Sequence, residues 1–267
     1  LQLTLEGSAD LHSQSLRVDK GWLSTPQARL GLQGEGTFNP PAFTGNVELD
    51  GSPRKLAALA GLTLKPAPQG AADGLNLKAR LTADSSSLNL SDMHASLDDT
   101  SLRGQCRLDM KAGSPLSITA GVQIGTVNLD NYLPRPTGKS GKSDSAATPS
   151  AATAPKDSSP DKSALPNINI RLDIAGLSMG KLHAGDIHIA AQGQRGNYNL
   201  TAFSAVLGSG GKITATGAAR LANAAQPAYA LKGRAAEVDL GGLLESLDKG
   251  RPLNGTAQLD VDLTASG

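Results

Sequence analysis

The sequence predicts an all-β protein whose strands form a curved, twisted antiparallel sheet, with a few short helices. Three observations support this fold class. Apolar and polar residues alternate over many short stretches, which is the pattern of a strand with one wet face. Glycine is abundant, with 31 residues in a chain of 267, and strongly curved sheets need glycine. Only 3% of the residues are aromatic, so burial depends on small aliphatic side chains.

The strand pattern is clearest in Leu75–Leu81, Leu116–Ile124 and Ile168–Ile174, where every second residue is apolar. Shorter stretches of the same kind begin at Ile187 and Leu259. Such alternation is typical of antiparallel sheets, because strands of parallel sheets are usually buried on both faces and consist of continuous apolar runs.

Short helical phrases follow three of the alternating stretches. One begins at Ser52-Pro53, one starts at Thr126 or Asn128 and ends at Tyr132-Leu133-Pro134, and one is capped by Asp239. Once 134–166 is set aside, the phrases recur about every 75 residues. We therefore predict stacked repeats, each made of several strands closed by a short helix.

The chain divides at a low-complexity tract. Residues 134–166 show no hydrophobic periodicity and are dominated by Ser, Ala, Thr and Pro. Such a tract cannot bury enough apolar surface to offset its ordering entropy, so we predict a flexible insertion there. The predicted organisation is β-groove repeats over 1–133, the insertion at 134–166, and a further β-groove repeat over 167–267.

The composition argues against several classes of protein. A net charge of +1 and few aromatic side chains do not favour nucleic-acid binding. The single cysteine, Cys106, excludes an intrachain disulfide and a cysteine-based zinc site. His183 and His188 lie five positions apart on a strand pattern, which does not favour joint metal ligation. We expect no catalytic residues, no metal, no cofactor and no enzyme activity.

The apolar residues of the alternating strands are the candidate functional residues. An open curved sheet would present them as an apolar trough suited to acyl chains, whereas a closed sandwich would use them as its core. Alternation alone leaves both possibilities open. The candidate lining residues are Leu75, Leu77, Leu81, Ile118, Val122, Ile124, Ile170, Leu172, Ile174, Ile187, Ile189, Ile213, Val261 and Leu263.

The chain resembles the AsmA family, most closely from about Thr126 to Gly267 and more weakly over Leu1 to Gly51. In that family a Leu-Asp-x-Tyr-Leu-Pro phrase commonly precedes a variable insertion, and 129–134 has this form. A Gly-Leu step and a Gly-Gly turn follow in order, at 176–177 and 210–211. The pieces that carry the resemblance are VNLDNYLP, LPNINIRLDIAGLSMGKLHAGDIHIAAQG, GNYNLTAFSAVLGSGGKITATGAARL, VDLGGLLESL and PLNGTAQLDVDLTASG.

The resemblance implies a repeating β-groove similar to the bridge-like lipid-transfer proteins. It implies a soluble periplasmic segment of an inner-membrane-anchored protein of Gram-negative bacteria, with the anchor outside this sequence. Its expected role is to hold phospholipid acyl chains during lipid transport and outer-membrane biogenesis. The alternative is a non-enzymatic scaffold that binds assembly factors or outer-membrane protein precursors along its sheet edges. The opening Leu1 and the lack of any apolar run near the roughly 20 residues of a membrane span agree with a segment of a longer protein.

Overall fold

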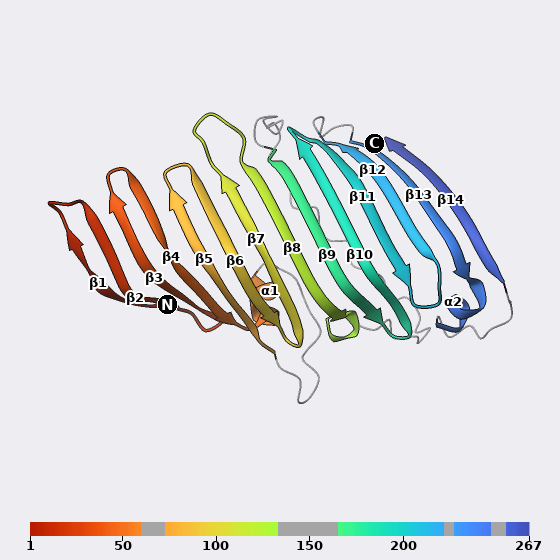
Figure 1. Ribbon diagram of the computed structural model, residues 1–267, viewed down its shortest axis with the longest axis horizontal. Helices are drawn as coiled ribbons and strands as arrows, with labels where there is room; N and C mark the ends of the chain where they lie inside the picture. Colours follow the sequence, from red (N-terminus) through yellow and green to blue (C-terminus); the bar gives the residue numbers. More distant parts are fainter. Residues whose placement is uncertain (60–72, 133–164, 222–226, 247–254, 267) are drawn as a thin grey trace, which may run out of the picture.

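A single open sheet contains, in chain order, the fourteen strands that the described residues form (Figure 1). The computed structural model describes residues 1–59, 73–132, 165–221, 227–246 and 255–266. The all-β prediction is confirmed. The strands are β1 (Gln2–Asp10), β2 (Ser15–Ser24), β3 (Ala28–Phe38), β4 (Pro41–Gly51), β5 (Leu75–Asp84), β6 (Ser87–Leu97), β7 (Thr100–Asp109), β8 (Ser117–Asn128), β9 (Asn167–Met179), β10 (Leu182–Gln194), β11 (Asn197–Leu207), β12 (Lys212–Arg220), β13 (Ala228–Asp239) and β14 (Thr256–Ser266).

Three short helices follow β4, β8 and β13 and begin where the sequence predicted. They are α1 (Pro53–Leu59), the 3-10 helix η1 (Leu129–Asn131) and α2 (Leu240–Ser246). The side chain of Asn128 caps η1 by accepting a hydrogen bond from the Asp130 amide, and Asp239 accepts one from the Gly241 amide. Because β4, β8 and β13 end on the same side of the sheet, all three helices lie there, and we call this side the helix edge.

One strand pair departs from the antiparallel prediction. Strands β8 and β9 are parallel, paired from Ser117 with Asn167 to Asn128 with Ser178. A hairpin would have reversed the chain, but β9 begins at the side opposite the helix edge, the far edge. The connection 129–166 therefore starts at one edge of the sheet and ends at the other. The predicted flexible insertion occupies this connection, and its residues 134–164 lie outside the described residues.

The parallel pair explains why the blocks between helices differ. Four strands precede α1 and four precede η1, but five precede α2. Since β9 enters from the far edge, an odd number of strands is needed to bring the chain back to the helix edge. The fifth strand of the third block returns the chain to the helix edge. Each block therefore still ends in a short helix at that edge, as the predicted repeat requires.

Cross-strand pairing gives the sheet one apolar face and one polar face. Paired residues lie on the same side of a sheet. Leu77 pairs with Leu49 and Ala95, whereas its neighbour Lys78 pairs with Glu48 and His94. We call the side that carries Leu77 the apolar face and the side that carries Lys78 the polar face.

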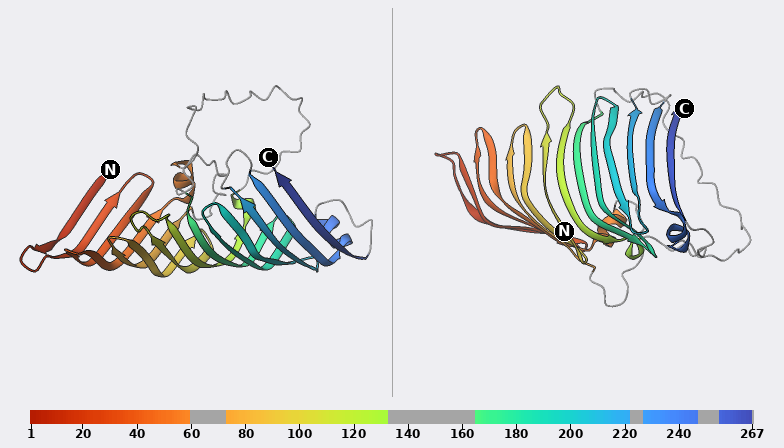
Figure 2. Two further views of the ribbon diagram at one scale, coloured as in Figure 1. Left: turned by 90° about the horizontal axis from the view of Figure 1, so that it is seen from above. Right: turned by 45° about the vertical axis from the view of Figure 1, so that its right-hand side comes forward.

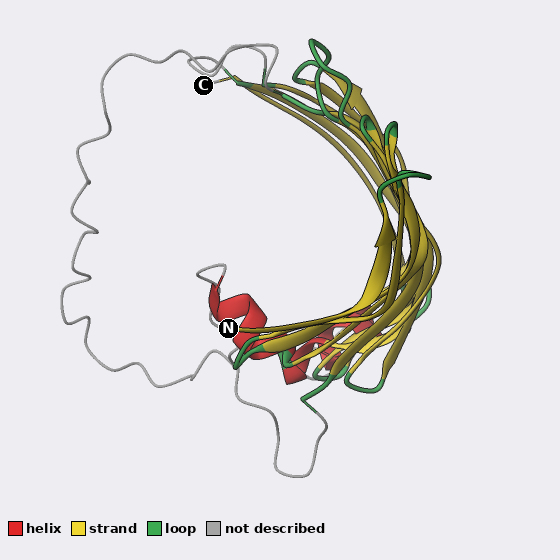
Figure 3. Cartoon of the chain, turned by 90° about the vertical axis from the view of Figure 1, so that its left-hand side faces the viewer, coloured by secondary structure: helices red, strands yellow, loops and turns green. Residues whose placement is uncertain are grey.

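The strands bend into an arc around an open interior (Figures 2 and 3). Register shifts interrupt β6, β10 and β13 at residues with left-handed backbone, namely Asp92 (φ 50°), Asp186 (φ 47°) and Glu237 (φ 56°). Such bulges bend a strand and increase its twist. They supply the curvature that the glycine content predicted.

Glycine geometry shows that the apolar face is the inner face of the arc. A Cβ atom added to Gly34, Gly45 or Gly104 on this face would overlap a backbone carbonyl oxygen of the neighbouring strand. A Cβ added to Gly121 on the polar face would meet nothing within 4 Å. Neighbouring backbones approach most closely on the concave side of a bent sheet, and at these three positions only glycine fits.

The described residues form no second layer over the apolar face. Among the described residues, buried apolar residues are few, and no large side chain is fully buried. Most apolar side chains on this face are instead half-buried against their strand neighbours. Within the described part of the chain, the sheet is therefore an open trough and not a sandwich. The buried apolar residues are Val18, Ala79, Ile187, Ala205 and Val238.

The variants Gly104→Ala and Gly121→Ala test the direction of curvature. Gly104→Ala should lower the free energy of unfolding by about 2 kcal/mol, because its methyl group meets backbone that cannot yield. Gly121→Ala, on the next strand and the opposite face, should change it by less than about 0.5 kcal/mol. Urea unfolding followed by circular dichroism measures both. Equal destabilisation would show that the apolar face is not the inner one.

Candidate functional site

The apolar face is the candidate functional site, and it is continuous across the sheet. Most of its residues form four neighbouring rows of cross-strand partners that run from β1 to β14 and are interrupted only at the register shifts. Part of one row is Leu30, Leu49, Leu77, Ala95, Leu102, Ile124, Ile174 and Ile187.

All of the lining residues predicted from the sequence lie on this face. Ile187 is buried, and Leu263 is 57% exposed because β14 has a neighbouring strand on one side only. The remaining predicted residues are half-buried. They are Leu75, Leu77 and Leu81 on β5, Ile118, Val122 and Ile124 on β8, Ile170, Leu172 and Ile174 on β9, Ile189 on β10, Ile213 on β12 and Val261 on β14.

The prediction missed the parts of the face formed by β1–β4, β6, β7, β11 and β13. Leu30-Gly31-Leu32 and Val47-Glu48-Leu49 show the same alternation, so the signal was present in the sequence. In β7, glycine and cysteine hold positions of the apolar face and make the pattern harder to see. Further residues of the face that the sequence did not single out are Leu23, Leu32, Val47, Leu90, Leu108, Phe203 and Leu231.

No charged side chain enters the four rows. Their only polar side-chain atoms are the thiol of Cys106 and the hydroxyls of Tyr198 and Tyr229. The Tyr198 hydroxyl donates to the carbonyl of Pro166, 3.0 Å away, at the far edge. A surface of this composition offers almost no hydrogen bonds to a ligand, so it can bind only apolar groups.

The polar face carries paired charges instead. Lys78 contacts Glu48 at 2.7 Å, His188 contacts Asp173 at 2.6 Å, and Lys232 contacts Asp262 at 3.3 Å. These pairs join side chains of neighbouring strands that are largely exposed, so each contributes little to stability. Their main effect is to keep the polar face hydrated.

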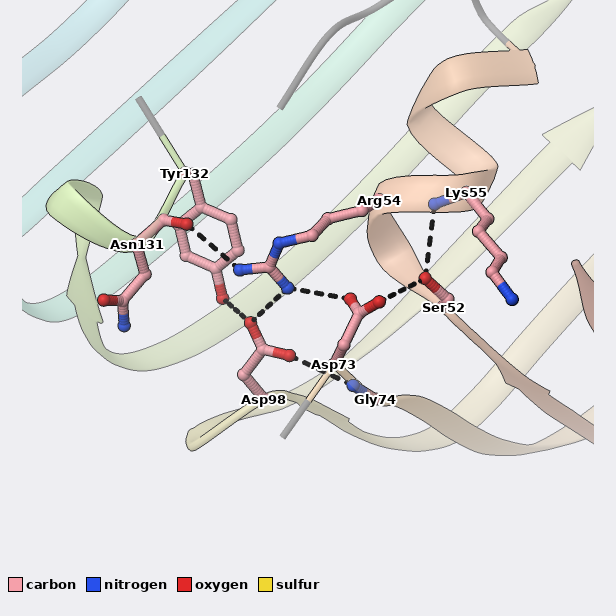
Figure 4. A network of polar contacts seen from close by, with 8 residues as sticks. All are labelled: Ser52, Arg54, Lys55, Asp73, Gly74, Asp98, Asn131 and Tyr132. Atoms are coloured by element: carbon pink, nitrogen blue, oxygen red, sulfur yellow. Dashed lines mark hydrogen bonds and ion pairs between the residues drawn. The ribbon is translucent and has the colours of Figure 1, made fainter. Parts of the chain in front are cut away.

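At the helix edge, a polar cluster joins α1 to two turns and to η1 (Figure 4). Arg54 on α1 contacts Asp73 at 2.7 Å and Asp98, in the β6–β7 turn, at 3.4 Å. It also donates to the carbonyl of Asn131 at 3.0 Å and stacks 5.4 Å from the ring centre of Tyr132. The Tyr132 hydroxyl donates to Asp98 at 2.7 Å. We call Arg54, Asp73, Asp98 and Tyr132 the Arg54 clasp.

The family-like phrase at 129–134 has a physical role in this cluster. Tyr132 reaches the β6–β7 turn through Asp98, and Asp130 accepts a hydrogen bond of 2.6 Å from the amide of Gly180 in the β9–β10 turn. Asp130 and Tyr132, which follow β8, thus connect the end of this strand to the β6–β7 turn and to the β9–β10 turn at the helix edge. The sequence analysis did not predict this clasp, because its residues lie far apart in the sequence.

The charged side chains of the Arg54 clasp contact one another in a position that is largely removed from water. Arg54 and Asp98 side chains are only 11% and 6% exposed. Burial opposes ionisation of Asp73, but hydrogen bonds from Ser52 and Arg54 outweigh it and keep the pKa of that carboxyl below its usual value. Burial and the hydrogen bond to Asp98 raise the pKa of Tyr132 to about 12. These contacts position α1 and η1 against the sheet.

Within the described part of the chain, no three His, Cys, Asp or Glu side chains gather in a way that could hold a metal ion. No helix among the described residues is long and apolar enough to cross a membrane.

An open, one-layered sheet whose concave face is apolar defines a β-groove protein. The family model of the AsmA family matches residues 42–267. The chain therefore belongs to the AsmA family, a membrane-associated bacterial family whose general role concerns lipids and the outer membrane. No curated protein and no solved structure gives a significant match.

Replacing Arg54 should destabilise the protein strongly. Arg54→Met leaves the buried Asp98 carboxylate without its cation and should lower the free energy of unfolding by about 3 kcal/mol. Arg17→Met is the control, because Arg17 and its partner Asp19 are 64% and 54% exposed, and it should leave the urea midpoint unchanged. A midpoint that shifts equally in the two variants would contradict the clasp.

The titration of Tyr132 tests the same cluster at high pH. Its pKa is raised from 10.0 to about 12, so the neutral hydroxyl is favoured by folding. This stabilisation is complete below pH 10 and is lost as the pH rises towards about 12. Phenolate absorbance of the protein minus that of Tyr132→Phe should show one group titrating near pH 12. A difference curve centred near 10 would count against the hydrogen bond to Asp98.

Proposed function

We propose that the apolar face holds phospholipid acyl chains and thereby supports lipid transport between membranes. The chains lie along the concave face, while headgroups stay in the water at its open side. No step requires a reactive residue, so the process is passive binding and movement along the face.

The single observation that carries the proposal is the unbroken apolar surface. Fourteen strands spaced by about 4.8 Å make it about 60 Å long. One leaflet of a bilayer is about 15 Å of hydrocarbon, so the face exceeds several acyl chains in length. An exposed apolar patch of this size is rare on a soluble surface and marks a binding site.

The two edges of the trough suit a ligand with a polar end. The turns at both edges carry polar residues, such as Asp98-Asp99 at the helix edge and Asp84 with Ser86 at the far edge. A headgroup can reach these edges without crossing the apolar rows. Because the rows contain no charged group, they distinguish lipids by their chains rather than by their headgroups.

The proposed location is the periplasm of a Gram-negative bacterium, with attachment to the inner membrane through a segment outside this sequence. Family membership supports this placement at the coarser level of a membrane-associated bacterial protein. In this setting the groove would supply an apolar path for lipids on their way to the outer membrane.

A second candidate function is a scaffold that captures protein segments along its sheet edges. It is favoured by one observation, namely that β1 and β14 each pair with one strand only in the described part of the chain. Assembly factors or outer-membrane protein precursors could add a strand there. Scaffolding requires no bound lipid. Cross-linking of a protein partner to β1 or β14 would distinguish it from acyl-chain binding.

Bound lipid is the first expected result. Native mass spectrometry of the purified protein, followed by organic extraction, should detect phospholipid. The double variant Ile118→Asp/Ile170→Asp places two charges on the apolar face and should lose most of this lipid. The control Thr119→Asp/Arg171→Asp changes the next residue on each strand, on the polar face, and should keep the lipid.

A second readout covers the case in which the aspartate variant fails to fold. Cys106 is the only cysteine and lies on the apolar face. An environment-sensitive fluorophore on Cys106 should shift to the blue when phosphatidylcholine vesicles are added. The same label on Gln105→Cys in a Cys106→Ser background, one residue away on the polar face, should not respond. Lipid-free protein with no response at Cys106 would refute the proposal.

A further inference from the structure

A hollow lined by uncharged polar side chains lies on the polar face of β8–β11. It has a volume of about 720 Å³ and lies mainly between two adjacent rows of cross-strand partners. We call it the amide hollow. One row is Thr119, Asn169, Gln192 and Asn199, and the other is Ser117, Asn167, Gln194 and Asn197.

The hydrogen-bonding groups of these two rows are unused inside the protein. None of their side chains forms a hydrogen bond with another described residue. The side-chain oxygen of Asn167 is buried and has no partner among the described residues, so a ligand in the hollow cannot reach this atom. The exposed amides of Asn169, Gln192, Gln194, Asn197 and Asn199 line the hollow and are available to a ligand.

The amide hollow differs from the rest of the polar face. Elsewhere, ion pairs such as Lys78–Glu48 and Lys232–Asp262 join neighbouring strands. In the hollow, six side chains are amides and two are hydroxyls, and the one charged lining residue is Arg195 in the β10–β11 turn. A charged ligand would find little complementary charge there, whereas a neutral one would find a dense array of donors and acceptors.

The position of the hollow excludes binding by strand addition. Strands β8 to β11 are paired on both sides, so no free backbone edge is available to an extended peptide. A ligand must be recognised by side chains alone. Each carboxamide offers donors and an acceptor a short distance apart, which matches neighbouring hydroxyls of a sugar ring. The volume also lies within the range of about 300–1,000 Å³ that small ligands occupy.

We propose that the amide hollow is a binding site for a neutral oligosaccharide. Its ligand hydroxyls exchange hydrogen bonds with the two amide rows. The site lies on the face opposite the acyl-chain surface, so it does not depend on the proposed lipid function, and both ligands can be bound together. A glycan bound in the amide hollow would contact the convex side of the sheet. The concave side would remain accessible to acyl chains.

Saturation-transfer NMR of the whole chain with maltohexaose and with chitohexaose tests this site. We expect transfer from the protein to at least one of these neutral sugars. The double variant Asn169→Asp/Gln192→Glu keeps the shape of both side chains but removes their amide donors, and it should weaken binding about tenfold or more. The control Thr214→Ala/Thr216→Ala removes two hydroxyls from the same face on β12 and should bind as the wild type does.

Both variants change exposed side chains, so circular dichroism should show native sheet in each. Absence of transfer to either sugar would overturn the proposal, and so would equal binding by the wild type and the Asn169→Asp/Gln192→Glu variant. Stronger binding of the anionic polymer polygalacturonate than of the neutral sugars would also overturn it. Lipid content is measured in a separate experiment, so absence of sugar binding would not affect the acyl-chain proposal.

Discussion

The structure depends on one constraint, namely that a single-layered sheet has no core to hold it together. Its stability must come from the backbone ladder between strands and from side chains that pack beside one another on one face. This explains why the apolar face is unbroken. A charged residue in any row would remove lateral packing from both neighbouring strands, and no second layer exists among the described residues to compensate. The requirement for stability and the capacity to bind acyl chains are therefore met by the same side chains.

The position of the helices at one edge also follows from the single layer. The ends of strands in an open sheet fray unless something ties them together. Here α1 and η1 are joined through Arg54, Asp98 and Tyr132, across the ends of the intervening strands β5 to β8. The extra strand of the third block brings α2 to the same edge.

The two faces of the sheet could be predicted from the sequence because a strand has a period of two, which is a local property. Helix starts could be predicted for the same reason, since Pro53, Asn128 and Asp239 act on their own neighbours. The parallel pairing of β9 could not, because the direction in which a chain re-enters after a long insertion is not encoded nearby. Nor could the clasp, in which Arg54 and Asn131 are separated by 77 positions. The Asn-Ile-Asn-Ile pattern of β9 was visible, but the amide hollow exists only through the register of four strands.

Strand order also determines how the chain reaches this structure. Every strand pairs with its neighbours in the sequence, so the sheet can grow by successive hairpins as the polypeptide emerges, with little loss of entropy at each step. Three pairings close longer connections, namely 52–74 between β4 and β5, 129–166 between β8 and β9, and 240–255 between β13 and β14. The connection 129–166 is the longest of the three, and closing a loop about ten times longer than a hairpin turn costs about 2 kcal/mol more in chain entropy. The addition of β9 to β8 is therefore the pairing that costs the most chain entropy.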